Sequence, residues 1–75
     1  MIPLSRLPLG RCARILSLSA AEPLNSRLLD LGFVPGGMVR PLYAAPLGDP
    51  RAYLVCETVI ALRQRDAATV AVEEA

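Results

Sequence analysis

The chain has 75 residues, of which 53% are hydrophobic, and a formal net charge of +1. This length allows one domain, expected to comprise residues 1–75, and is too short to enclose a large substrate cavity. The absence of histidine excludes Ser-His-Asp triads, Cys-His pairs and HExxH zinc sites. The chain has eight basic and seven acidic side chains, so its charge does not indicate binding to a phosphate backbone. One Phe and two Tyr leave few aromatic rings for stacking on bases. We therefore expect a binding protein without a cofactor, not an enzyme.

The N-terminal ten residues are expected to form an extended arm along the core, because Pro3 and Pro8 disfavour a helix. The next segment, 11–18, is predicted to be the first strand. No apolar stretch approaches the ~20 residues of a membrane span, and segment 15–21 is too short and serine-broken for a signal peptide. We expect a cytoplasmic chain with no direct membrane insertion.

A helix is predicted over residues 23–31. Leu24, Leu28 and Leu31 follow helical spacing and should form one apolar stripe that packs in the core. Gly32 directly after them should end the helix in the left-handed conformation. So short a helix is marginal alone, and its stability must come from docking on the rest of the domain.

Four further strands are expected after the helix, at residues 38–45, 51–56, 58–63 and 69–72. Pro41 cannot donate a ladder hydrogen bond, so its strand should be an edge or carry a bulge there. A turn at 65–68, with Asp66 as its side-chain cap, precedes the last strand, and Glu73 and Glu74 should fray. The pattern predicts a mainly β fold: a small, partly open five-stranded barrel with one short α-helix inserted after the first strand.

The two cysteines, Cys12 and Cys56, lie in strand-like runs, where a free Cys usually behaves as a small buried hydrophobe. The alternative is a pair of thiolate metal ligands, with Glu57 as a carboxylate beside Cys56. Because the chain has neither His nor a CxxC pair, we expect no metal site. Two cysteines are too few for a disulfide-stapled secreted domain, and a reducing setting fits them best.

Two motifs stand at a fixed distance in the chain, RLLDLGFVPG at 27–36 and APLGDP at 45–50. The first resembles the RLxxLGFxPG helix and turn of the FeoA family, and the second matches the APLGDP hairpin of that family. The segments YLV, IALR and DA between 53 and 67 resemble its YxV…IALRxxDA ending. The resemblance covers about residues 9–72. Cys56, where the family usually has Gly, and Pro41 depart from the pattern.

FeoA proteins are small cytosolic companions of FeoB, a membrane ferrous-iron transporter with a cytosolic G-protein domain, and have an SH3-like barrel fold. The resemblance implies an SH3-like protein-interaction module that supports iron uptake by binding FeoB. Within the shared motifs, the residues expected to serve core packing or turn geometry are Leu28, Leu31, Gly32, Phe33, Pro35, Gly36, Pro46, Gly48 and Pro50.

The residues left for a partner are the exposed helix flank and the turn at 46–50. We expect Leu29 and Leu47 to be apolar anchors. Arg27 and Asp49 would give polar orientation, and Asp30 belongs to the same helix flank as Arg27. Asp49 has an equally supported alternative role as a turn cap.

Two alternative functions remain open at this stage. The same module occurs as the C-terminal domain of iron-dependent repressors, but no helix-turn-helix precedes it here, which favours the free-standing form. A small Cys-based metal-binding protein is the second alternative. Exposed leucines leave homo-oligomer formation open, and the motifs do not distinguish effects on GTP hydrolysis, gating or assembly of the transporter.

Overall fold

A computed structural model describes residues 1–75. Its elements in chain order are β1 (Ile2–Pro3), the 3-10 helix η1 (Leu4–Arg6), β2 (Ala13–Leu18), α1 (Leu24–Leu31), β3 (Met38–Ala44), β4 (Arg51–Val55), β5 (Thr58–Leu62), α2 (Gln64–Ala67) and β6 (Val70–Glu74). The mainly β fold with a helix after the first long strand is confirmed. Neither helix is long and apolar enough to cross a membrane.

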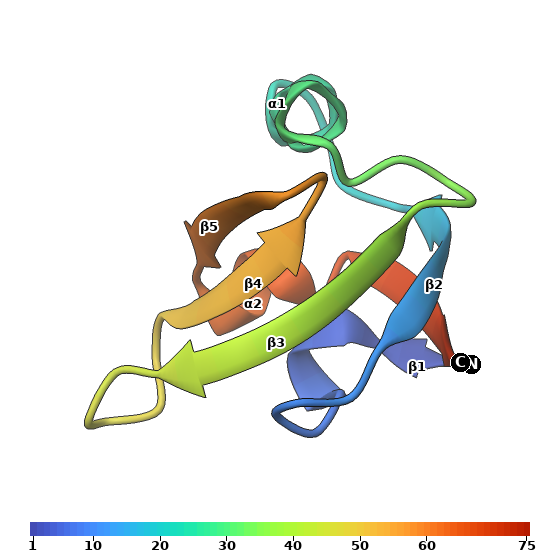
Figure 1. The fold of residues 1–75 in the computed structure, drawn as a ribbon. Coiled ribbons are helices and arrows are strands. Elements are labelled where there is room, and N and C mark those ends of the chain that lie inside the picture. The colour runs from blue at the N-terminus through green and yellow to red at the C-terminus, as the bar shows by residue number, and fades with distance from the viewer.

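All strand pairs are antiparallel and form one sheet in the order β1-β6-β2-β3-β4-β5. The sheet curves around the core, with α1 at one end (Figure 1). Strands β1 and β5 are its two edges and do not pair, so the barrel is partly open, as predicted. Helix α2 packs against η1. The structure has six strands where the sequence predicted five, because β1 in the N-terminal arm adds a short one.

The N-terminal arm departs from the extended form that its prolines predicted. Only Ile2 and Pro3 pair with β6, and the next three residues turn through η1. This turn directs Leu4 and Leu7 into the core, where both are fully buried. In a fully extended arm Leu4 and Leu7, three residues apart, would lie on opposite faces, whereas the turn brings both to the same side.

Arg51 of β4 fastens this arm to the sheet. Its Nη1 donates to the Ser5 carbonyl at 3.2 Å and its Nη2 to the Leu7 carbonyl at 2.7 Å. The guanidinium carbon also lies 5.3 Å from the ring centroid of Tyr53, a cation–π arrangement. One Arg side chain therefore connects two segments that are more than forty residues apart in sequence.

Tyr53 is fully buried in the core. Its ring meets Phe33 edge to face, with centroids 6.4 Å apart, and its hydroxyl is buried without a hydrogen-bond partner. Burial raises the pKa of Tyr53 above its ordinary value, and the nearby positive charge of Arg51 opposes that rise. The phenol is therefore held neutral in the folded state.

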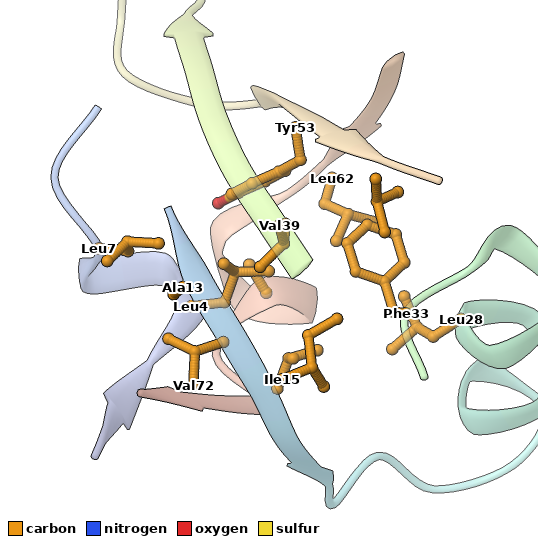
Figure 2. Close-up of a cluster of buried hydrophobic side chains, with 13 residues drawn as sticks. Leu4, Leu7, Ala13, Ile15, Leu28, Phe33, Val39, Tyr53, Leu62 and Val72 are labelled. Atoms are coloured by element: carbon orange, nitrogen blue, oxygen red, sulfur yellow. The ribbon is translucent and has the colours of Figure 1, made fainter. Parts of the chain in front are cut away.

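The core gathers buried side chains from the arm, α1 and the strands, which point into the space enclosed by the sheet (Figure 2). Leu28 and Phe33 are fully buried, as predicted. Leu24 and Leu31 are only partly buried and pack against the edge of this cluster. The helix stripe is thus confirmed, with its centre at Leu28.

Pro41 is buried in β3, and the register of β3 against β4 shifts between Pro41 and Tyr43. The predicted bulge is therefore confirmed. The bulge places the missing N–H of proline where the ladder is already interrupted.

The C-terminal predictions need correction. Glu73 and Glu74 do not fray: they continue β6 opposite Arg14 and Ala13, and Glu74 forms an ion pair with Arg11. The expected turn at 65–68 is instead the one-turn helix α2, and the Asp66 side chain does not cap it. The cross-strand pairing with β2, which a local pattern cannot show, stabilises this end of the chain.

Candidate partner-binding surfaces

The turn between β3 and β4, residues 45–50, presents the most exposed large hydrophobic side chain of the molecule. Leu47 at its tip is 97% exposed. The Gly48 N–H donates to the Ala45 carbonyl at 2.7 Å, and the Ala45 N–H donates to the Pro50 carbonyl at 2.9 Å. We call residues 45–50 the Leu47 turn. Because the turn is already ordered by its own hydrogen bonds, docking through Leu47 costs little further backbone entropy.

Asp49 ties the Leu47 turn to the start of α2. Its Oδ1 accepts a hydrogen bond from the Gln64 N–H at 2.9 Å, and the Gln64 amide nitrogen donates back to the Gly48 carbonyl at 2.8 Å. A carboxylate at a helix N-terminus accepts a hydrogen bond from an N–H group that has no partner within the helix, and its negative charge interacts favourably with the helix dipole. Asp49 therefore provides the cap that the sequence assigned to Asp66, and it holds the turn that presents Leu47.

Helix α1 carries the second group of predicted residues, and both of its ends are fixed. The Glu22 carboxylate accepts hydrogen bonds from the Ser26 N–H and hydroxyl, each at 2.9 Å. These bonds hold the pKa of Glu22 below its ordinary value. Gly32 ends the helix with φ 109°, a left-handed conformation that a side chain would strain.

The exposed flank of α1 presents Arg27, Leu29 and Asp30. Leu29 is 38% exposed and lies about 100° around the helix from the buried Leu28. No ion pair joins Arg27 and Asp30, so both charges face solvent. This flank therefore presents one partly exposed apolar side chain with two unpaired charges beside it.

The structure does not bring the two predicted groups together. Helix α1 and the Leu47 turn lie at opposite ends of the molecule, with the length of β3 and β4 between them (Figure 1). A partner that contacts Leu29 and Leu47 at once must therefore extend along the whole molecule, whose longest dimension is 29 Å. The five predicted residues form two separate surfaces.

A third surface escaped the sequence analysis: a groove of about 370 Å³ on the outer face of β3 and β4. It is lined by side chains that include Cys12, Met38, Arg40, Leu54, Cys56 and Glu57. Met38 is 44% exposed, and Arg40 pairs across the sheet with Leu54. We call this the outer groove.

Alternation along residues 38–45 already placed Met38 and Arg40 on the same face. What the sequence did not supply was the register that brings Leu54 opposite Arg40, because Pro41 shifts the pairing of β3 with β4. A period-2 pattern identifies which residues share a face but not which residues of the neighbouring strand join them.

Both cysteines are exposed and free, so the expectation that they are buried is wrong. Cys12 precedes β2, and Cys56 lies in the β4–β5 turn with φ 50°, followed by Glu57 with φ 61°. The Cys56 thiol lies 3.7 Å from the Gly32 carbonyl. A tight hairpin thus forms although Cys56 occupies a glycine-like conformation. No group of three or more acidic or thiol side chains is arranged to hold a metal ion.

Comparison with known proteins gives a consistent result. The model of the FeoA domain family matches residues 2–74. A fusion of Fe(2+) transport protein A with the Fe(2+) transporter FeoB from Porphyromonas gingivalis is 36% identical over 70 residues, which are 93% of this chain. The chain spans only 8% of the length of that fusion protein.

Two solved structures are also similar. Iron(II) transport protein A from Clostridium thermocellum is 40% identical with a TM-score of 0.92, over 97% of this chain and 45% of that one. FeoA of Stenotrophomonas maltophilia, solved with zinc and described as a procaryotic SH3 domain protein, is 36% identical with a TM-score of 0.85, over 97% of this chain and 91% of that one. The predicted SH3-like fold is therefore confirmed. The chain belongs to the FeoA domain family.

Proposed function

We propose that this chain is an accessory module of ferrous iron transport that binds a FeoB-type membrane transporter at its cytoplasmic side. The observation that carries the proposal is Leu47, 97% exposed at the tip of an ordered turn. A large apolar side chain held in water by a fixed backbone contributes nothing to the fold and is suited to a pocket on a partner. The fusion of such a domain to a transporter in Porphyromonas gingivalis supports the choice of partner.

Leu47 is the primary anchor in this proposal, and Asp49 positions it by fastening the turn to α2. The second contact surface consists of the C-terminal end of α1 together with the outer groove. The helix end and the groove are continuous, because the Cys56 side chain of the groove meets Gly32 at the end of the helix. Leu29 supplies the apolar part of this contact, and Arg27 and Asp30 supply its charges.

Binding of a protein partner also fits the chemistry of the surface better than binding of a metal ion. The outer groove brings Cys12, Cys56 and Glu57 to one region, but their side chains do not form a cluster of three ligands. Stable binding of a transition metal by protein alone needs such a set. The groove is therefore proposed as contact surface.

Ferrous iron uptake by cells that lack the chain tests the proposal. Uptake should return with the wild-type chain and fall with Leu47→Ala and with Leu29→Ala, the former more strongly. Leu9→Ala removes an equally large side chain that is 50% exposed on the N-terminal arm, and it should leave uptake unchanged. Full uptake with both Leu29→Ala and Leu47→Ala would refute the assignment of the surface.

A further inference from the structure

Strand β5 is a free edge of the sheet. It pairs with β4 on one side and with no strand on the other, and it forms the outer rim of the fold (Figure 1). Its residues Thr58–Leu62 read TVIAL, with no charge and no proline, and their register against β4 has no bulge. Natural edge strands are commonly protected against pairing by charges, prolines or bulges within the strand. This one has none of these.

The tight β4–β5 hairpin determines which backbone groups face outward. Its two-residue turn, Cys56 and Glu57, makes Val55 and Thr58 a hydrogen-bonded pair. Hydrogen-bonded and non-hydrogen-bonded pairs alternate along an antiparallel ladder, so Ile60 and Leu62 also bond to β4. The N–H and C=O groups of the intervening Val59 and Ala61 therefore point away from β4. None of the backbone hydrogen bonds outside the helices and strands uses Val59 or Ala61.

We propose that β5 pairs with β5 of a second copy of this chain, antiparallel, about a twofold axis at Ile60. In this register Val59 of each copy faces Ala61 of the other, and both carry the outward-facing groups. Each such pair exchanges two N–H···O bonds, so the contact contains four backbone hydrogen bonds. It is the register that pairs Thr58–Leu62 along its full length.

Charge complementarity at the ends of β5 supports a second copy as the occupant. Glu57 directly precedes the strand and Arg63 directly follows it. Antiparallel pairing about Ile60 places Glu57 of one copy beside Arg63 of the other, at both ends of the contact. Both side chains are exposed, and neither forms an ion pair within the chain. A twofold contact must be self-complementary, and this edge meets that condition.

The side chains of β5 are also suited to this contact. Ile60 is partly buried and packs against the core. Pairing brings the two Ile60 side chains together across the axis on the core side, where a non-hydrogen-bonded pair places side chains closest. Val59, 53% exposed on the outer side, meets the small Ala61 of the second copy.

Sedimentation of the purified chain across concentrations reaching the millimolar range tests the proposal, and it needs no transporter, so its outcome is separate from that of the proposed function. We expect reversible dimer formation. Glu57→Arg and Arg63→Glu should each raise the dimer dissociation constant about tenfold, since two attractive pairs become repulsive. The double variant Glu57→Arg/Arg63→Glu should restore the wild-type constant. A chain that stays monomeric, or single variants that dimerise unchanged, would overturn the proposal.

Ala61→Pro gives an independent test, because its N–H faces away from β4 and its loss breaks no bond inside the chain. The variant should keep the wild-type fold, seen by circular dichroism, and raise the dissociation constant roughly thirtyfold through the loss of two hydrogen bonds. Hydrogen exchange of the wild type should show Val59 and Ala61 amides protected only at high concentration. Dimers in which those two amides exchange freely would place the contact elsewhere and refute the β5 pairing.

Discussion

Replacement of Arg51 by Met should release the N-terminal arm. The substitution keeps most of the aliphatic stem but removes two charge-assisted hydrogen bonds to the Ser5 and Leu7 carbonyls and the cation–π contact with Tyr53. Net contributions of about 1–1.5 kcal/mol for each bond, in a partly buried site, and ~0.5–1 kcal/mol for the ring contact give a loss of about 3 kcal/mol. That is a large part of the roughly 4–11 kcal/mol expected for a domain of this size.

Thermal unfolding followed by circular dichroism measures this effect. At about 4–8 °C per kcal/mol for so small a domain, the midpoint should fall by roughly 12–24 °C. Arg14→Met is the matched control, because Arg14 is exposed and its side chain forms no hydrogen bond or ion pair in the structure. Trypsin should cleave after Arg6 faster in Arg51→Met than in the control. A midpoint within a few degrees of the wild type, with unchanged cleavage, would refute the role of Arg51.

Three further substitutions test local features of the fold. Tyr53→Phe removes a buried hydroxyl without a hydrogen-bond partner and should raise the free energy of unfolding by about 1 kcal/mol. Because the raised pKa of Tyr53 makes the stability of the wild type fall above pH ~10, the variant should also lose that decline. A variant less stable than the wild type would show that the hydroxyl has a hydrogen-bond partner. Cys56→Gly should gain about 0.5–1 kcal/mol in urea unfolding by relieving a left-handed conformation, whereas Cys56→Ala should not, and equal effects would contradict the strain. Glu22→Gln should be less stable than the wild type above pH ~4.5, and this difference should vanish as the pH falls through the lowered pKa of Glu22. A difference that does not change with pH would rule out the ionised carboxylate of Glu22 as the cap of α1.

Local sequence patterns were sufficient for the elements whose cause is local. The leucine spacing and Gly32 predicted α1 to within one residue at its start, and Pro41 predicted the bulge in β3. Both features depend on neighbours along the chain, which a sequence displays directly. The order of short strands and one helix predicted the partly open barrel, and the shared motifs added that it is SH3-like.

Features created by distant contacts were the ones that the sequence could not supply. The cap of α2 is Asp49, fifteen residues before Gln64, whereas the sequence predicted a cap from Asp66 within the same short segment. The N-terminal arm is fixed by Arg51, one of eight arginines that the composition could not rank. In each case the deciding contact depends on strand register, which no local periodicity encodes.

The candidate site shows the same division. Exposure of Leu47 and Leu29 was predicted from a turn tip and a helix flank, and the structure shows both side chains exposed. Their separation by the length of the barrel, and the outer groove near α1, required the three-dimensional structure. The predicted partner-binding residues therefore lie on two separate surfaces, which only a large partner can engage together.

The most direct test of the central claim is the binding of the purified chain to a detergent-solubilised FeoB-type transporter from the same organism, measured with GDP and with a GTP analogue. The account predicts saturable binding in at least one nucleotide state, weakened about tenfold or more by Leu47→Ala and unaffected by Leu9→Ala. An absence of binding in both nucleotide states, with a transporter that still binds nucleotide, would contradict the account.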